Sequence, residues 1–297
     1  MKVPEWIGRR AFSSNTHIKS LLKELSLNTI CESAKCPNIN ECFGKGSATF
    51  LILGNICTRN CGFCNVKHGV PTPIDKSEPY RVAEAVKRLG LLYVVITSVT
   101  RDDLPDGGAS QFITTVAAIR KQKTEDRCQK SDVRSQKTED GRQGPDIELL
   151  LPILENRWLN QIVAIQPKVM AHNIETVPRL YAQVRPCFNY SEAIKFLNYV
   201  KRADNSILTK SGIMVGLGET QKEVIEVMND LRAQGVNILT IGQYLKPSGR
   251  QLPVVEYVQP AQFDEYKRIG QEMGFKYVAS APYVRSSYKA WEGESCS

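Results

Sequence analysis

From about Ala48 onwards, short apolar runs alternate with longer amphipathic stretches along the chain. Short apolar runs bounded by polar and turn-forming residues predict buried strands. The predicted strands are 48–53, 92–97, 147–151, 162–165, 212–215, 236–241 and 277–279.

Three amphipathic stretches between these runs predict helices. The first, 78–89, has Pro79 in its first turn and places Val82, Ala85, Val86 and Leu89 on one face. The second, 220–234, begins with the capping-box pair Thr220 and Glu223 and ends before Gly235. The third, 260–273, turns Tyr266, Ile269 and Met273 inward.

The repeated order of strand and then helix indicates parallel strands joined by right-handed crossovers. The sequence therefore predicts an α/β fold, a barrel or partial barrel. In such a fold the active site lies at the carboxyl ends of the strands.

Residues 121–144 depart from this pattern because they are almost wholly polar. The sequence QKTEDR at 122–127 recurs there as QKTEDGR at 136–142. A polar near-duplicate without an apolar period cannot bury a face. We expect a disordered surface insertion that lengthens a helix–strand connection.

The positive charge of the chain either belongs to ordinary solvated surface or favours an acidic protein partner. Lys and Arg number 39 against 31 Asp and Glu, which gives a net charge of +8. No run interleaves basic with aromatic residues as a nucleic-acid groove would, and the apolar runs are too short to cross a bilayer. The first ten residues do not resemble a secretion signal. We therefore expect a cytoplasmic protein that binds neither nucleic acid nor membrane.

The cysteines are the strongest chemical signal. Six of the nine fall between Cys31 and Cys64, and clustering in a reducing compartment favours metal over disulfides. Cys57, Cys61 and Cys64 form a C-x3-C-x2-C triad after the first predicted strand. Three thiolates can hold three irons of a [4Fe–4S] cluster and leave the fourth iron open. A zinc site with His68 as fourth ligand is the alternative.

The C-x3-C-x2-C spacing, with aromatic Phe63 before the last cysteine, resembles the radical S-adenosylmethionine (SAM) superfamily. The resemblance implies a partial (β/α)6 barrel. It also implies that SAM binds the open iron and is cleaved by an electron from the cluster. The resulting 5′-deoxyadenosyl radical then removes hydrogen from an unactivated carbon.

A second triad just upstream narrows the resemblance. Cys31, Cys36 and Cys42 have the spacing C-x4-C-x5-C, which is similar to the auxiliary [4Fe–4S] site of the lipoyl synthase family. Further segments read like that family in its order, from PEWI through CPNINEC, ATFLILGNICTRNCGFC, VTRDDLPDGGA, AHNIETVPRLY, VRP, KSGIMVGLGET and QYLKPS to RSSYKA.

The resemblance divides the chain into three parts. It implies an N-terminal extension at 1–47 with the auxiliary cysteines, a partial barrel at 48–280 and a C-terminal segment at 281–297. In RSSY of that segment, the family pattern makes Ser287 the fourth ligand of the auxiliary cluster, with Ser286 left open. Arg285 is expected to orient substrate or cluster.

Residues that follow predicted strands are candidates for contact with SAM. Thr97, Ser98 and Asp103 follow one strand, and Asn173 follows another beside His172, which we interpret as structural. Gly216, Gly218 and Glu219 lie between a strand and a helix, where a backbone turn can approach a carboxylate or ribose. A tight turn that needs glycine for its own geometry explains the same residues.

The resemblance implies insertion of two sulfur atoms, at C6 and C8, into a protein-bound octanoyl group, with the auxiliary cluster as the sulfur donor. The expected partners are an octanoylated lipoyl domain of a 2-oxoacid dehydrogenase (E2) or the glycine-cleavage H protein. An electron donor such as ferredoxin or flavodoxin and an iron–sulfur carrier protein are expected as well.

Two other hypotheses cover part of the sequence. A radical SAM enzyme that inserts one sulfur, as biotin synthase does, shares the triad at Cys57 but does not explain the second triad with RSSY. A zinc module that binds nucleic acid explains the thiols and the basic charge, and predicts zinc and steeply salt-dependent binding.

Overall fold

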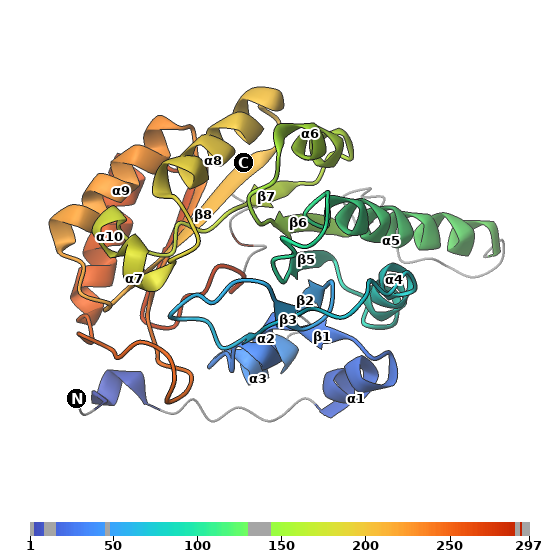
Figure 1. Cartoon of the computed structure of the whole chain (residues 1–297), viewed down its shortest axis with the longest axis horizontal. Helices are drawn as coiled ribbons and strands as arrows, with labels where there is room; N and C mark the ends of the chain where they lie inside the picture. The colour runs from blue at the N-terminus through green and yellow to red at the C-terminus, as the bar shows by residue number, and fades with distance from the viewer. Residues whose placement is uncertain (1–2, 9–15, 45–47, 130–143, 289–291, 293–297) are drawn as a thin grey trace.

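The computed structural model describes residues 3–8, 16–44, 48–129, 144–288 and 292. One large curved sheet forms the centre, and helices cover its outer side (Figure 1). No helix in these described ranges is long and apolar enough to cross a membrane.

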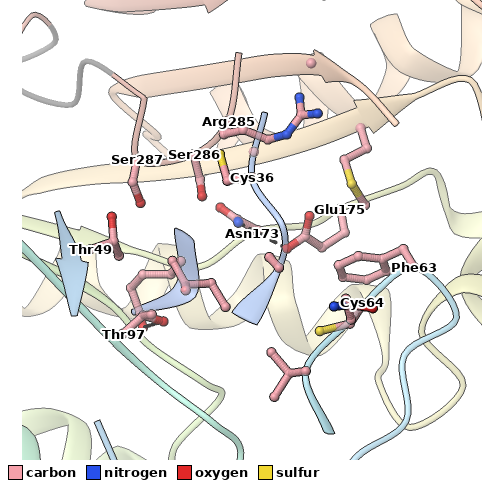
Figure 2. A pocket seen from close by; sticks show the side chains of 18 of the residues that line it. Cys36, Thr49, Phe63, Cys64, Thr97, Asn173, Glu175, Arg285, Ser286 and Ser287 are labelled. Carbon is pink, nitrogen blue, oxygen red and sulfur yellow. Dashed lines mark hydrogen bonds between the residues drawn. The ribbon is translucent and has the colours of Figure 1, made fainter. Parts of the chain in front are cut away.

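The sheet has eight strands in the order β1-β2-β5-β6-β7-β8-β9-β10. All neighbours pair in parallel except β1, which runs antiparallel to β2. The strands are β1 (Asn28–Thr29), β2 (Thr49–Ile52), β5 (Tyr93–Ser98), β6 (Asp146–Leu150), β7 (Val169–Ala171), β8 (Leu208–Val215), β9 (Ile238–Gln243) and β10 (Tyr277–Ser280). A separate parallel pair joins β3 (Ile56–Cys57) to β4 (Lys67–His68). At the carboxyl ends of the large sheet, side chains enclose a cavity (Figure 2).

Among the described residues, the barrel consists of six strand–helix units and one further strand. The helices that follow the strands are α4 (Glu78–Arg88), α5 (Ala109–Gln129), α6 (Asn156–Ala164), α8 (Tyr190–Ala203), α9 (Gln221–Ala233) and α10 (Pro260–Glu272). The connection between β7 and α8 also contains η2 (Pro178–Leu180) and α7 (Tyr181–Val184). The prediction of a partial (β/α)6 barrel is confirmed, with β10 as an additional parallel strand.

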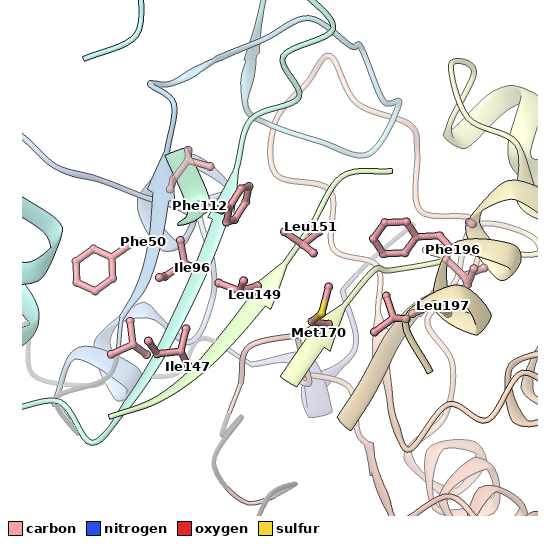
Figure 3. Close-up of a cluster of buried hydrophobic side chains, with 14 of the residues drawn as sticks. Phe50, Ile96, Phe112, Ile147, Leu149, Leu151, Met170, Phe196 and Leu197 are labelled. Carbon is pink, nitrogen blue, oxygen red and sulfur yellow. The ribbon is translucent and has the colours of Figure 1, made fainter. Parts of the chain in front are cut away.

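The hydrophobic core lies between the sheet and these helices (Figure 3). Alternate residues of a strand face opposite sides, so Ile147 and Leu149 of β6 point to the helices while Leu150 faces the cavity. Met170 of β7 packs with Phe196 and Leu197 of α8 in the same core. Burial of each such side chain stabilises the fold by about 1.5–3 kcal/mol.

A buried ion pair lies within the barrel. On each of the two strands involved, the charged residue comes two positions before a residue that lines the cavity. Lys210 of β8 donates to both oxygens of Glu148 on β6 at 2.9 Å, and the Tyr93 hydroxyl donates to Glu148 at 2.7 Å. Both charged side chains are almost fully buried. The next inward-facing residues, Leu150 and Gly212, line the cavity, so the pair lies beneath its floor.

The prediction of a strand at 162–165 is wrong. Ile162 and Val163 are buried in the last turn of α6, and the strand is β7, Val169–Ala171, after Pro167. A short apolar run looks alike in a buried helix and a buried strand, so its pattern does not decide between them. The other six predicted strands are present, with ends shifted by a few residues.

The helical predictions are confirmed by α4, α9 and α10. Thr220 and Glu223 form the expected capping box of α9, and Gly235 adopts a φ of 78° just after it. The polar segment differs in part from its prediction. Helix α5 continues to Gln129, so residues 121–129 are helical, and 130–143 lie outside the described residues.

Four helical segments precede the barrel: η1 (Glu5–Ile7), α1 (Thr16–Glu24), α2 (Ile30–Ser33) and α3 (Ile39–Gly44). They are joined to the sheet through β1, whose Asn28 and Thr29 pair with Leu51 and Phe50 of β2. Because β1 lies at the edge of the sheet, it brings α2 and α3 to the end of the barrel where the cavity opens.

Candidate functional site

The cavity at the carboxyl ends of the strands has a volume of 530 Å³. All six clustered cysteines line it, although three belong to the loop after β2 and three to the N-terminal extension. Ser286 and Ser287 of the C-terminal segment line it too. The fold therefore brings both predicted cysteine triads and the RSSY motif to one cavity.

The loop with Cys57, Cys61 and Cys64 is fixed on several sides. The backbone N–H groups of Arg59 and Thr100 donate to the Cys57 sulfur at 3.4 and 3.3 Å. Gly62 donates to the Val184 carbonyl and accepts from the Leu252 N–H. A Cβ at Gly62 would lie 2.8 Å from the Leu252 side chain, so glycine permits this close approach. N–H donors to a ligating sulfur stabilise the thiolate and tune an iron–sulfur cluster.

The second triad comes from two short helices of the extension. Cys31 lies in α2, whose first turn is capped by the Thr29 side chain, Cys36 in the following turn, and Cys42 in α3. The side-chain amide of Asn65 donates to the Ser33 carbonyl at 2.8 Å. That hydrogen bond joins the two cysteine-bearing segments.

At four of the cysteines, burial favours the neutral thiol in the absence of metal. Desolvation raises the pKa of Cys31 and of Cys61 to about 12 and that of Cys64 to about 11. It raises the pKa of Cys36 as well, partly opposed by the positive charge of Arg285. A thiolate in such a site needs a bound cation, since coordination deprotonates the thiol outright.

The C-terminal segment approaches the extension from the opposite end of the sheet. The Asn38 side-chain amide donates to the Tyr283 carbonyl at 2.6 Å, and the Tyr288 hydroxyl donates to Glu41 at 2.9 Å. Gly242 of β9 makes room for this segment, because a Cβ there would lie 2.0 Å from the Val284 carbonyl oxygen.

Figure 2 shows Arg285, Ser286 and Ser287 along one side of the cavity, with Cys64 and Phe63 across from them. Both serine hydroxyls face the interior, so the geometry keeps Ser286 open beside Ser287. The Arg285 guanidinium donates to the Val284 carbonyl at 2.6 Å. Burial lowers the pKa of Arg285, and the nearby Cys36 and Glu175 oppose that shift.

Several buried polar atoms of the cavity wall have no hydrogen-bond partner. Among the described residues they are Asn38 Oδ1, Ser98 Oγ, His172 Nε2, Asn173 Oδ1 and Arg185 Nε. Buried polar groups are nearly always paired, so a polar molecule that fills the cavity is the natural partner for these atoms. Thr97 also lines the cavity, but its hydroxyl donates to the Leu150 carbonyl at 2.9 Å.

His172 is buried beside these atoms and is neutral. Its Nδ1 lies 2.8 Å from the Leu151 carbonyl, and burial lowers its pKa to about 3. Because His172 lines the cavity and its Nε2 has no partner among the described residues, the imidazole can serve as a neutral hydrogen-bonding group there, in addition to the structural role predicted for it.

Glu175, which follows the same predicted strand as Asn173, and Arg185, which is not among the predicted site residues, also line the cavity. The Asn173 amide donates to Glu175 at 3.1 Å, and the Arg185 guanidinium donates to the Asn173 carbonyl at 2.7 Å. Burial raises the pKa of Glu175, with Arg185 opposing it. Their signal in the sequence was their place in AHNIET and VRP, two segments already noted for other reasons.

Four predicted SAM-contacting residues do not line the cavity. Asp103 pairs with Arg101 at 2.8 Å. Gly216 and Gly218 adopt φ values of 102° and 109°, and Glu219 accepts hydrogen bonds from the N–H groups of Gly216 and Leu217. The Glu219 carboxylate thus binds the backbone of its own turn, while the Gly216 and Gly218 carbonyls accept from Val255 and Arg179. Of the predicted SAM contacts, Thr97, Ser98 and Asn173 line the cavity.

Comparison with known proteins gives the family. The chain is 50% identical to lipoyl synthase from Caldanaerobacter subterraneus subsp. tengcongensis, with 99% of this chain and 98% of that protein covered. It is 48% identical to lipoyl synthase from Caldicellulosiruptor saccharolyticus, over 98% of this chain and 97% of that protein. The chain belongs to the lipoyl synthase family. The family model described as Radical SAM superfamily matches residues 51–231.

Solved structures agree with this fold. Methylornithine synthase superposes with a TM-score of 0.56 at 14% identity, covering 94% of this chain and 86% of that one. The FeFe-hydrogenase maturase HydG from Carboxydothermus hydrogenoformans gives a TM-score of 0.55 at 15% identity, over 95% and 68%. Membership of the lipoyl synthase family makes this chain a sulfur-inserting radical SAM enzyme, with SAM and [4Fe–4S] clusters as its cofactors.

The residues of the cavity fit these cofactors better than a single metal ion. Ligands that share one zinc ion crowd around it at about 2.0–2.3 Å. In the described ranges, no three His, Cys, Asp or Glu side chains are close enough to hold one ion. Thiolates that each bind a different iron of a cluster stand further apart, with the cluster between them. His68, the fourth ligand of the zinc alternative, is exposed and does not line the cavity.

Proposed function

We propose that this protein inserts two sulfur atoms, at C6 and C8, into an octanoyl group carried on a lysine of a lipoyl-carrier domain. The observation that carries this proposal is the convergence of two cysteine triads and the RSSY serines on one cavity. A cavity that held only the Cys57 triad would serve radical formation but would contain no second cluster to donate sulfur.

Each triad has a separate role in the proposal. Cys57, Cys61 and Cys64 hold the cluster that binds SAM, and Cys31, Cys36 and Cys42 hold the auxiliary cluster together with Ser287. When bound, the first cluster would supply the electron that cleaves SAM to methionine and a 5′-deoxyadenosyl radical able to remove hydrogen from the acyl chain, and the second would supply sulfide. The three-part division at 1–47, 48–280 and 281–297 follows from these roles.

The polar wall of the cavity orients the bound molecules. Ser98, His172 and Asn173 offer unpaired polar atoms to SAM, and Arg185 holds the backbone of Asn173 in place. Thr97 and Phe63 line the same cavity. We also propose that Asp103, Gly216, Gly218 and Glu219 act through the shape of their loops, since their polar groups are already engaged.

The carriers that we propose are the octanoylated lipoyl domain of a 2-oxoacid dehydrogenase (E2) and the glycine-cleavage H protein. A small low-potential protein such as ferredoxin or flavodoxin would supply electrons, and an iron–sulfur carrier protein would rebuild the auxiliary cluster. Clustered cysteines that form no disulfide among the described residues suit a reducing compartment such as the cytoplasm.

The deciding experiment measures iron, sulfide and product together. Reconstituted protein should contain about eight irons and eight sulfides per chain and should convert an octanoylated carrier to the lipoyl form. The Cys31/Cys36/Cys42 triple-alanine variant should retain about four irons, cleave SAM and form no lipoyl group. Four irons in both proteins would contradict the proposal and indicate a simpler radical SAM enzyme.

A further inference from the structure

The opening of the cavity carries two cations. Of the cavity-lining residues that the structure describes, Lys35 and Lys246 are exposed to solvent, and the rest are buried or half-buried. Lys35 belongs to the N-terminal extension, next to Cys36, whereas Lys246 lies in the loop after β9. Because exposed lining residues mark where a cavity meets solvent, two separate segments each place a lysine at the opening.

These two lysines differ from the arginines on the outer surface. Arg179 pairs with Glu223, Arg88 with Glu24, and Arg268 with Glu265. Within the described ranges, neither Lys35 nor Lys246 forms an ion pair. An exposed cation without a partner in its own chain is available to a carboxylate of another molecule.

Each lysine is connected to one of the cysteine triads, Lys35 through the chain itself and Lys246 through a hydrogen bond of its loop. Lys35 adopts a φ of 51°, and its N–H donates to the Glu32 carbonyl at 3.1 Å within the turn that leads into Cys36. The loop with Lys246 continues to Gln251, whose side-chain amide donates to the Cys64 carbonyl at 3.0 Å. A molecule held by both lysines is therefore fixed relative to both triads.

We propose that Lys35 and Lys246 dock the carrier domain by binding carboxylates that flank its octanoyl-lysine. This inference rests on the proposed function, which requires an acyl chain to enter the cavity while the folded carrier stays outside. Apolar lining side chains such as Phe63, Leu150 and Met214 suit the chain, and the amide that joins it to lysine is uncharged. Recognition of the carrier by charge must then occur at the opening, where an acidic surface complements the two lysines.

The test compares Lys35→Glu, Lys246→Glu and the double variant with Lys267→Glu as a matched control. Lys267 is an exposed lysine on α10 that does not line the cavity. Each protein is assayed with the octanoylated carrier domain and with a short octanoyl-lysyl peptide whose flanking residues are neutral. SAM cleavage is followed as 5′-deoxyadenosine, and iron content is measured on the same samples.

The double variant should raise KM for the carrier on the order of tenfold at low salt, with less effect as salt rises. Turnover of the neutral peptide, KM for SAM and iron content should stay at wild-type values, and Lys267→Glu should match wild type throughout. A carrier whose flanking carboxylates are changed to lysine should recover affinity for the double variant.

Other outcomes separate the possible failures. An unchanged KM for the carrier in an enzyme that forms lipoyl groups would overturn the docking proposal alone. A raised KM for SAM would mean that the lysines attract that cofactor instead, which also overturns it. A wild-type enzyme that forms no lipoyl group on either substrate would contradict the proposed function itself. Because Lys35 is next to Cys36, Lys35→Glu could disturb the auxiliary site itself. Lys246 is not adjacent to a cysteine, so Lys246→Glu tests docking without that complication.

Discussion

The two cysteine triads line one cavity, yet the protein builds their surroundings in different ways. The Cys57 loop follows directly from β2 and is held by the β3–β4 pair and by neighbouring loops of the barrel. The second triad needs two distant segments to meet, with Asn38 of the extension bonded to Tyr283 of the C-terminal segment. The first site is thus part of the barrel, whereas the second forms where the N-terminal extension contacts the C-terminal segment.

This difference suits the two roles that we propose. A site that cleaves SAM repeatedly has to remain fixed, and N–H donors to the Cys57 sulfur keep its ligand oriented. A site whose cluster gives up sulfur has to be taken apart and rebuilt. Two short helices and a terminal segment can separate at a lower cost than a barrel strand, because fewer buried contacts are lost.

The largest effect should come from changing one triad at a time. Cys57→Ala should abolish both SAM cleavage and lipoyl formation, because it removes a ligand of the radical-forming cluster. Cys36→Ala should abolish lipoyl formation while SAM cleavage continues. Quantifying 5′-deoxyadenosine and lipoyl product by mass spectrometry in parallel checks this. Loss of SAM cleavage in both variants would mean that the sites are not independent.

The next comparison concerns the two serines. Ser287→Ala should destabilise the auxiliary cluster and abolish lipoyl formation, whereas Ser286→Ala, its matched control, should retain both. Iron content and Mössbauer spectra of reconstituted protein report the change in ligand. The reverse result would assign the ligand to Ser286, whose hydroxyl also faces the cavity.

A smaller effect is expected at the junction between the two ends of the chain. Asn38→Ala removes the hydrogen bond to the Tyr283 carbonyl and leaves that oxygen without this donor, which costs about 1–3 kcal/mol. The auxiliary cluster should be lost faster under a mild chelator, while SAM cleavage stays at the wild-type rate. Equal loss of iron from both sites would show that the junction stabilises the whole molecule.

The same difference explains which features could be predicted from the sequence. Strand–helix alternation and the capping box of α9 are local patterns, so the barrel could be predicted apart from the strand placed at 162–165. Motif resemblance located the cysteines and RSSY. Local sequence carried no sign of β1, or of the pairing of Asn38 with Tyr283, because these contacts join segments far apart in the chain.

Contacts with SAM are harder to predict from the sequence than the barrel for a related reason. Asp103 and Glu219 follow strands, as contacts do, but their carboxylates are used by Arg101 and by the N–H groups of Gly216 and Leu217. A position after a strand predicts nearness to the cavity. Which side chains enter it depends on local pairing that a sequence pattern does not specify.

The smallest effect is expected from a substitution in the barrel, away from the junction between the two chain ends. Thr220→Ala removes the N-cap of α9, where the Thr220 side chain accepts from the Glu223 N–H, and should lower the free energy of unfolding by about 1 kcal/mol. Helix α9 lies on the outer side of the sheet, away from both triads, so iron content and both reaction steps should match wild type. Chemical denaturation of the protein gives the stability change, and the product assays above give the rest. If this variant lost auxiliary iron as Asn38→Ala is expected to, general stability would explain the loss, and the special role given to the junction between the two chain ends would be wrong.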